Sequence, residues 1–204
     1  MSGGHFPTKV GAVVLAAGSS SRMQGIKQLL PWKDSTMVSH VLDQLKESDA
    51  CHVFLVLGAY HSEILSKIDT RNITVVLNQN WTLGMGSSIA RIATYIQKEG
   101  IEIDALLLAT SDQPILELNT YNKLINSSIN SNRIVATSYG KSYGIPAVFG
   151  RDYFEELSCL NKDTGAKAVI KKHLKHLILL DDPKAEIDLD TIELYQKFYA
   201  IYGS

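Results

Sequence analysis

The stretch Val10-Gly11-Ala12-Val13-Val14-Leu15-Ala16-Ala17-Gly18-Ser19-Ser20-Ser21 decides the fold class. Its first seven residues form an apolar run rich in valine, and the run ends in small and polar residues around Gly18. A short, nearly continuous apolar run closed by a glycine turn is typical of a strand buried on both faces, as in parallel sheets. Ligands of open α/β sheets bind beyond the carboxyl ends of such strands, so the loop from Ala17 onward is the first place to look for a site.

Similar apolar runs alternate with amphipathic stretches along the rest of the chain. The predicted strands are Val10–Ala16, Val53–Leu57, Thr74–Leu77, Ala105–Ala109, Arg133–Thr137, Ala147–Phe149 and a late edge strand at Leu177–Leu180. The predicted helices are Thr36–Glu47, His61–Ile68, Ser87–Lys98, Asn119–Ser127, Tyr153–Leu160 and Gly165–His173. This alternation indicates an α/β fold, a Rossmann-like three-layer sandwich with a mostly parallel sheet.

The bulk composition narrows the function classes. The 204 residues fit one domain, predicted at 10–204 after a disordered leader at 1–9. A net charge of -1 gives no global field for nucleic acid or an anionic membrane, and no apolar run reaches the ~18 residues of a membrane span. We therefore expect a cytoplasmic protein. Cys51 and Cys159 lie far apart and outside any CxxC pattern, which predicts two reduced, buried thiols.

The loop after the first strand carries the chemistry of anion binding. Its small residues let the backbone approach a ligand, so that successive N–H groups can cradle an anion. Arg22 can form forked contacts to phosphate oxygens, and Lys27 can add a point charge. The loop is neither a Walker A loop nor a GxGxxG fingerprint. A flexible surface loop with two solvated cations is the alternative, and the loop taken alone favours it.

The whole string from Leu15 to Pro31 is more specific than its parts. It resembles the LAAGxSxRMGxxKxLLP signature of the NTP-transferase superfamily, most closely its MobA-like branch, and is similar there to the molybdenum-cofactor cytidylyltransferases. The resemblance runs from Val10 to about Tyr195. It includes the motifs Asn78-Gln79-Asn80-Trp81, Gly84-Met85-Gly86-Ser87-Ser88-Ile89, Ser111-Asp112-Gln113-Pro114, Gly144-Ile145-Pro146-Ala147-Val148-Phe149, Asp163-Thr164-Gly165-Ala166-Lys167 and Ile187-Asp188-Leu189-Asp190-Thr191.

The chain also departs from the family pattern. Gln24 stands where the family has a glycine after Arg-Met, and Gly25 follows it. The segment Lys33–Ser35 replaces a glycine that often precedes threonine, and Arg91 or a neighbour replaces a glycine in the helix after Ser88. The first departure leaves the register of that turn open, although Lys27 keeps its spacing from Arg22.

The resemblance implies a fold of the nucleotide-diphospho-sugar transferase type and an Mg²⁺-dependent nucleotidyltransferase. The expected donor is CTP, the expected acceptor is molybdopterin, and a molybdenum enzyme is the expected recipient of the product. Cytidylyl or uridylyl transfer to a small sugar or alditol phosphate stays open. A nucleotide-binding maturation factor without turnover stays open as well.

Three aspartates are candidates for the metal. Asp112 follows a buried strand, where a carboxylate can hold Mg²⁺ beside a triphosphate, although a turn or N-cap aspartate is equally common there. Asp188 and Asp190 alternate about Leu189 and therefore point the same way in an extended segment; a solvated acidic turn is the alternative. The resemblance implies that Asp112 and Asp190 are the ligands, with Asp188 as the alternative to Asp190.

The remaining assignments concern the two substrates. The resemblance implies that Arg22, Lys27 and Asp112 are catalytic. The implied nucleotide-binding residues are Leu15, Ala16, Ala17, Gly18, Ser19, Ser20, Ser21, Asn78 and Ser87. Asn78 and Ser87 would face the base or ribose, although each can equally be a turn or cap residue. The Ala16-Ala17 pair resembles the LAAG pattern of cytidylyl-type members, whereas guanylyl-type relatives usually read LAGG, so the resemblance implies CTP rather than GTP. Gly144–Pro146, with Lys141 nearby, is expected on the acceptor side.

Overall fold

The structure is a computed structural model, and it describes residues 8–20, 23, 25–129, 131–161 and 164–203. The predictions for Ser21 and Arg22, and for most of the leader, lie outside the described residues. Lys9, which the leader prediction included, is tied to the fold, because its backbone N–H donates to Asp104 Oδ2 at 2.8 Å. Among the described residues, no helix is long and apolar enough to cross a membrane.

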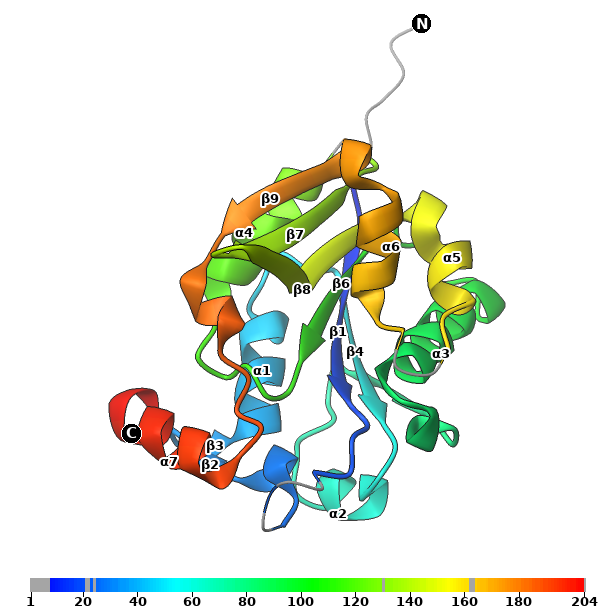
Figure 1. Ribbon diagram of the computed structural model, residues 1–204. Coiled ribbons are helices and arrows are strands. Elements are labelled where there is room, and N and C mark those ends of the chain that lie inside the picture. Colours follow the sequence, from blue (N-terminus) through cyan, green and yellow to red (C-terminus); the bar gives the residue numbers. More distant parts are fainter. Residues whose placement is uncertain (1–7, 21–22, 24, 130, 162–163, 204) are drawn as a thin grey trace, which may run out of the picture.

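A seven-stranded sheet forms the middle layer, with the strand order β5-β4-β1-β6-β8-β7-β9 (Figure 1). The strands are β1 (Val10–Ala16), β4 (His52–Leu57), β5 (Thr74–Leu77), β6 (Ala105–Thr110), β7 (Ile134–Tyr139), β8 (Ser142–Gly150) and β9 (Leu177–Asp181). Of these, β8 runs antiparallel to both of its neighbours, β6 and β7, and the other pairs are parallel. The predicted α/β class with a mostly parallel sheet is confirmed.

Helices cover both faces of this sheet (Figure 1). One face carries α3 (Met85–Lys98), α5 (Phe154–Ser158) and α6 (Ala166–Lys172), and the other carries α1 (Met37–Lys46), α2 (His61–Leu65) and α4 (Leu118–Ser128). Short 3-10 helices lie at Lys27–Leu29, Trp81–Leu83, Arg151–Tyr153, Leu174–His176 and Pro183–Glu186.

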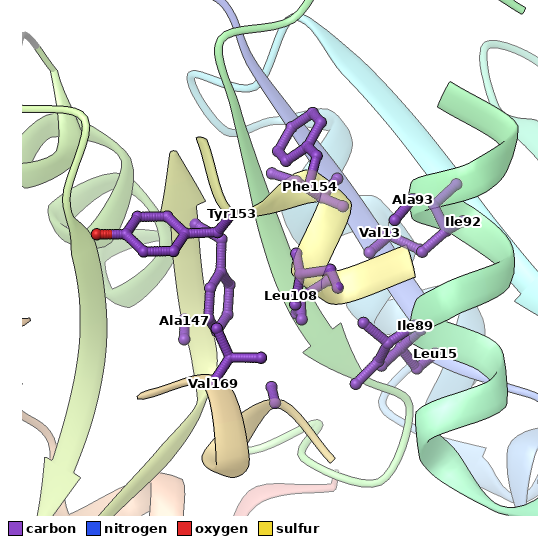
Figure 2. Packing of buried hydrophobic residues seen from close by; sticks show 14 of the residues in the cluster. Val13, Leu15, Ile89, Ile92, Ala93, Leu108, Ala147, Tyr153, Phe154 and Val169 are labelled. Carbon is purple, nitrogen blue, oxygen red and sulfur yellow. The ribbon is translucent and has the colours of Figure 1, made fainter. Parts of the chain in front are cut away.

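The first strand shows why its sequence is apolar throughout. Val13 and Leu15 face the layer of α3, where Ile89 and Ile92 pack against them (Figure 2). The intervening residues of β1 face the layer of α1 and α4. Because each fully buried aliphatic side chain contributes about 1.5–3 kcal/mol, a strand with two buried faces tolerates no polar residue on either. Packing on both faces therefore fixes β1 in place, and the site begins directly after it, at Ala17.

The C-terminal helix α7 (Ile192–Tyr202) was not predicted from the sequence. Thr191 caps it by accepting a hydrogen bond from the Leu194 N–H at 3.3 Å, and Tyr195 donates to the Pro31 carbonyl at 2.8 Å. It lies beside the small ribbon of β2 (Pro31–Trp32) and β3 (Ser35–Thr36) (Figure 1). A separate cluster fills this corner, formed by Met23, Trp32, Met37, Ile115, Leu189 and Tyr195. The helix thereby fixes the segment that carries Asp188 and Asp190.

Two smaller expectations need correction. Cys51 and Cys159 are free, as predicted, but both are exposed, because one follows the turn after α1 and the other ends α5. Strand β8 is longer than the predicted Ala147–Phe149, because it forms a hairpin with β7 through a turn in which Gly140 has φ +62°. Lys141 lies in the turn of this hairpin, between the end of β7 at Tyr139 and the start of β8 at Ser142.

Candidate active site

A cavity of about 450 Å³ opens at the carboxyl ends of β1 and β6 and extends to β8. This is the edge of the sheet that the topology predicts for a ligand site, and the volume suits a small-molecule ligand. Its lining comprises Leu15, Ala16, Ala17, Gly18, Lys27, Gln28, Gly84, Met85, Ser88, Thr110, Ser111, Asp112, Gln113, Tyr139, Tyr143, Gly144, Ile145, Gly165, Ala166, Lys167, Asp188 and Asp190.

The loop after β1 is shaped by one buried side chain that sequence reasoning missed. Gln28 is 1% exposed, and its Nε2 donates to the carbonyls of Ala16 at 3.0 Å and Gly18 at 2.8 Å. Its Oε1 accepts from the Ser20 hydroxyl at 3.0 Å, and the same hydroxyl oxygen accepts from the Lys27 N–H at 3.1 Å. The sequence feature that could have identified it is a glutamine within the largely apolar segment Ile26–Leu30, next to a lysine.

Two of the described residues in this loop adopt left-handed backbone conformations. Ser20 has φ +55° and Gly25 has φ +108°. The conformation at Gly25 requires glycine. The backbone therefore needs a glycine at position 25, directly after Gln24. Ser19 and Ser20 belong to the loop but do not line the cavity, whereas residues 15–18 do.

Lys27 joins the two acidic segments of the site. Its Nζ lies 2.7 Å from Asp112 Oδ2 and 2.7 Å from Asp190 Oδ1, and its side chain is 13% exposed. Burial lowers the pKa of Lys27, but the charges and hydrogen bonds of the two carboxylates outweigh burial, so the net shift of the pKa is upward. Lys27 is therefore held charged inside the cleft.

The aspartates are positioned by backbone contacts and by a buried leucine. Asp112 follows β6, and its carbonyl accepts the Leu189 N–H at 2.9 Å. The Leu189 side chain is fully buried in the corner beneath α7, while Asp188 and Asp190 on either side of it both line the cavity. Their alternation about Leu189 predicted this common direction. Asp112 and Asp190 thus contact one ammonium group, and Asp188 lines the same cavity.

This concentration of negative charge affects the pKa of Asp188. Its pKa is raised to about 7, first by burial of the carboxyl group and then by the charges of Asp112 and Asp190. The residue as a whole is exposed, but it lines the same cavity as Asp112 and Asp190, whose charges act on its carboxyl group. The cluster is short of positive charge, and a cation would stabilise it.

The donor set suits Mg²⁺ that a nucleotide helps to hold. Among the described residues, no group of three or more His, Cys, Asp and Glu side chains is arranged to hold an ion unaided. Mg²⁺ usually takes only one or two carboxylates, together with waters and substrate phosphates. Asp112 and Asp190 already share one cation, and Asp112 Oδ1 is buried and has no hydrogen-bond partner within the part of the chain that the structure describes. The residues therefore fit the metal that the sequence predicts.

Asn78 and Ser87 lie beside the cavity but do not line it. The Asn78 side chain is 3% exposed, and its Nδ2 donates to the hydroxyls of Ser87 at 2.9 Å and Ser88 at 3.0 Å. Ser87 in turn donates to the carbonyls of Asn80 at 3.0 Å and Gly84 at 2.7 Å. Both polar side chains hold the start of α3, and Ser88, which sequence reasoning did not select, is the serine of this pair that lines the cavity.

The opposite wall is built by the β7–β8 hairpin and the start of α6. It contributes Tyr139, Tyr143 and Ile145, and Lys167 is its cation. Lys167 Nζ donates to the Ser142 hydroxyl at 2.8 Å and lies 5.6 Å from the centre of the Tyr143 ring. The expected acceptor-side segment is thus present, with Lys167 rather than Lys141 in the lining.

Gln113 connects these elements beneath the cavity. Its Nε2 donates to the Ala185 carbonyl at 2.9 Å and to the Ile145 carbonyl at 3.5 Å. Its Oε1 accepts from the Thr110 hydroxyl at 3.2 Å. One buried amide therefore fixes the end of β6 against β8 and against the segment that leads to Asp188.

Comparison with known proteins gives a consistent relationship. A curated relative from Paenarthrobacter nicotinovorans, named nicotine blue oxidoreductase, is 30% identical over 197 residues, which are 90% of this chain and 93% of the relative. The crystal structure of a Mycobacterium tuberculosis Rv0371c homologue from Mycobacterium sp. strain JC1 has a TM-score of 0.82 and 26% identity, covering 95% of this chain and 96% of that chain.

Two further structures were solved with ligands. A manganese complex of Rv0371c from Mycobacterium tuberculosis H37Rv has a TM-score of 0.75 and 25% identity, covering 93% of this chain and 97% of that chain. A CMP:2-keto-3-deoxy-manno-octonic acid synthetase complexed with CTP has a TM-score of 0.68 and 14% identity, covering 95% and 98%. This second likeness shows the fold alone, which is the fold of nucleotidyltransferases.

The family model described as the MobA-like NTP transferase domain matches residues 12–177, which include the β1 loop, Asp112 and the hairpin wall. With the fold, the site and this match in agreement, the chain belongs to the MobA-like NTP transferase family.

Proposed function

We propose that the protein transfers an NMP unit from a nucleoside triphosphate to a phosphate-bearing acceptor and releases pyrophosphate, with CTP as donor and molybdopterin as acceptor. The observation that carries this proposal is Lys27 held between Asp112 and Asp190, directly beside a glycine-serine loop that opens into the same cavity. A lysine, two carboxylates that can hold Mg²⁺ and a loop of small residues that can approach phosphates are the parts that phosphoryl chemistry needs.

The two walls of the cavity have different tasks in this proposal. The β1 loop and the start of α3 hold the donor, with its phosphates against Ala17 and Gly18 and its base toward Ser88. Asn78 and Ser87 act there by holding α3, and Arg22 would add a forked phosphate contact. The β7–β8 wall takes the acceptor, and the ammonium of Lys167 meets its phosphate.

The reaction needs alignment and neutralisation of charge more than a base. An oxygen of the acceptor phosphate forms a bond to the α-phosphorus, and the bond between the α-phosphorus and pyrophosphate breaks, with pyrophosphate taking the electron pair. The acceptor phosphate is already ionised, so no strong general base is required. Lys27 stabilises negative charge between donor and acceptor. Mg²⁺ on Asp112 and Asp190 would neutralise phosphate charge, which is worth several kcal/mol in such sites.

Separate observations support the choice of metal, donor and acceptor. The relative solved with manganese supports a divalent cation, and the synthetase solved with CTP supports a cytidine donor in this fold. The Ala16-Ala17 pair follows the cytidylyl-type pattern. Molybdopterin rests on the sequence resemblance, and a molybdenum enzyme would then receive the product. A small sugar or alditol phosphate is the alternative acceptor, and a maturation factor without turnover is the non-enzymatic alternative.

A redox function is the second candidate. The relative from Paenarthrobacter nicotinovorans spans almost the whole chain and is named as an oxidoreductase. The contacts of Lys27 with Asp112 and Asp190 favour phosphoryl transfer, because a lysine and two carboxylates suit the phosphates and Mg²⁺ of a nucleotide. The two candidates differ in what they consume, so one assay format can separate them.

The test is a screen for pyrophosphate release with Mg²⁺. The four NTPs are combined with molybdopterin and with a panel of sugar and alditol phosphates, and a parallel arm follows NADH and NADPH oxidation with nicotine blue. We expect pyrophosphate release with CTP and molybdopterin and no oxidation of either dinucleotide. Oxidation without pyrophosphate release would overturn the proposal in favour of the second candidate. Binding of CTP without turnover for any acceptor would favour the maturation factor.

A further inference from the structure

We infer that Gln28 is the positioning residue of the donor site: it turns the backbone of the β1 loop so that N–H groups face the phosphates, and it sets the place of Lys27. The inference deepens the proposed function and rests on it. It starts from the side-chain contacts of Gln28 with described residues: the Ala16 carbonyl at the end of β1, and the Gly18 carbonyl and Ser20 hydroxyl in the loop.

The first step concerns the direction of two peptide groups. Gln28 Nε2 binds the carbonyl oxygens of Ala16 and Gly18 from the inner side of the loop. In a planar trans peptide, the carbonyl and the N–H of the next residue point in opposite directions. The N–H groups of Ala17 and Ser19 therefore point away from Gln28. Two N–H groups that both point away from the buried amide can donate to the oxygens of one phosphate.

The second step concerns Lys27. The Ser20 hydroxyl donates to Gln28 Oε1 and accepts the Lys27 N–H, so it connects the buried amide to the backbone of the lysine. Ser20 itself has φ +55°, a conformation that a non-glycine residue keeps only when surrounding contacts hold it. The ammonium of Lys27 then reaches Asp112 and Asp190 at 2.7 Å each. The loop and the catalytic cation thus depend on the same amide.

The third step is chemical. A glutamine at this position supplies two donors and an acceptor at once, and burial makes each lost partner costly. Methionine has a similar volume but none of these groups, and glutamate keeps the oxygen that faces Ser20 but places a carboxylate against two carbonyl oxygens. Gln28→Met and Gln28→Glu should therefore fail in the same way, whereas a residue that merely fills space would be replaced well by methionine.

The probe is tripolyphosphate with Mg²⁺, because it reports on the loop and requires neither a base nor an acceptor. Affinity is measured by titration calorimetry, and amide shifts of Ala17 and Ser19 are followed by NMR. We expect tripolyphosphate to bind the wild type and to shift both amides. In Gln28→Met and Gln28→Glu we expect at least about a tenfold loss of affinity, the order of one or two charge-assisted hydrogen bonds, and loss of both shifts.

A matched control separates positioning from stability. Gln44 is a half-buried glutamine on α1 whose Oε1 accepts the Leu118 N–H at 2.8 Å, outside the cavity lining. Gln44→Met should lower Tm and leave tripolyphosphate affinity unchanged. If Gln28→Met does not fold, Gln28→Glu and the milder Ser20→Ala still test the inference, with a smaller loss expected for Ser20→Ala because both carbonyl contacts remain.

The outcomes distinguish this inference from the proposed function. Wild-type affinity and normal amide shifts in either Gln28 variant would overturn the role of Gln28. Binding of tripolyphosphate by the wild type, lost in the variants, supports that role even if no NTP and acceptor pair gives turnover, in which case the proposed reaction fails alone. A wild type that does not bind tripolyphosphate would overturn the role of Gln28, whereas the proposed reaction would still be decided by pyrophosphate release.

Discussion

The ammonium nitrogen of Lys27 lies 2.7 Å from Asp112 Oδ2, and this contact joins positions 85 residues apart at the edge of the sheet. The second contact of Lys27, to Asp190 at 2.7 Å, brings in the segment beneath α7. One cation thus holds together the two carboxylates to which the proposal assigns Mg²⁺. Lys27 and the metal are expected to compete for them in the absence of nucleotide, and to cooperate once phosphates are present.

The first prediction concerns Asp112. Asp112→Ala should reduce the rate of pyrophosphate release by ~10²–10³-fold or more, the usual cost of removing one group that stabilises transition-state charge. Tm should change little, because Lys27 keeps Asp190 as a partner. Asp43→Ala, which removes an exposed carboxylate paired with Lys46, is the control and should keep wild-type turnover. A wild-type rate for Asp112→Ala at saturating Mg²⁺ would contradict the metal assignment.

The second prediction is that removal of the lysine tightens metal binding. Lys27→Met should bind Mn²⁺ at least about tenfold more tightly than the wild type without nucleotide, because a unit charge a few Å away at the protein surface is worth a few kcal/mol. The Mn²⁺ dissociation constant is measured by electron paramagnetic resonance. Turnover of the same variant should fall, mainly through kcat, since Lys27 acts as the acceptor approaches.

Lys46→Met is the control for Lys27→Met, because Lys46 also pairs with an aspartate but on the surface of α1. It should leave Mn²⁺ affinity unchanged. Weaker Mn²⁺ binding by Lys27→Met would mean that the lysine orients the carboxylates for the metal. A rise in the KM for the NTP with unchanged kcat would instead place Lys27 in ground-state binding of the donor.

Much of the fold and part of the site followed from local sequence patterns. The run Val10–Ala16 predicted a doubly buried strand, and the topology rule then placed the site at the ends of β1 and β6. The alternation of Asp188 and Asp190 about an apolar residue predicted their common direction. These features could be predicted because each depends on the periodicity of apolar residues and on position along the chain.

Features that depend on tertiary partners could not be predicted in this way. Helix α7 has no strongly one-sided apolar pattern, and the ring of its Tyr199 packs against the distant Trp32. The role of Gln28 depends on carbonyls ten and twelve residues earlier in the chain. The sequence predicted that Asn78 binds the base or ribose. In the structure, its amide donates hydrogen bonds to the hydroxyls of Ser87 and Ser88.

The third prediction tests the acceptor wall. Lys167→Met should raise the KM for a phosphate-bearing acceptor about tenfold and leave the KM for the NTP unchanged, because its ammonium lines the cavity beside Tyr143. Lys171→Met, an exposed lysine in the last turn of the same helix, is the control and should change neither constant. Steady-state kinetics with each substrate varied in turn decides the matter. An effect on the NTP alone would move Lys167 to the donor side.

The fourth prediction concerns stability in mild acid. The pKa of the buried His40 on α1 is lowered, first by burial and then by the charge of Lys33, with Asp43 opposing in part. Below pH 6.5 the unfolded chain therefore binds a proton that His40 in the folded state does not, so stability is lost as the pH falls and is retained above 6.5. Urea unfolding at pH 7.5 and pH 5 should show a smaller acid loss in His40→Gln. An equal loss, or the same change in the exposed control His176→Gln, would contradict this source of the pH dependence.

The last prediction concerns the choice of donor. Ala17 is buried, lines the cavity and packs in the cluster beneath α3, so its methyl group limits the space beside the loop. We expect kcat/KM to be highest for CTP, with GTP disfavoured by ~10–200-fold, the discrimination that apolar shape differences provide. Ala17→Gly removes the methyl group and should raise kcat/KM for GTP relative to CTP, at a cost in stability of about 1 kcal/mol from the freer backbone.

Gly18 provides the matched position for this experiment. An added methyl group there meets no atom within 4 Å, so Gly18→Ala should fold and should not widen the pocket. All four NTPs are compared with one fixed acceptor in the wild type and in both variants. If Ala17→Gly leaves the ratio of GTP to CTP unchanged while the wild type prefers CTP, selectivity resides in contacts to the base near Ser88. If the wild type uses GTP as well as CTP or better, the cytidylyl assignment fails, because the methyl group of Ala17 would then exclude nothing.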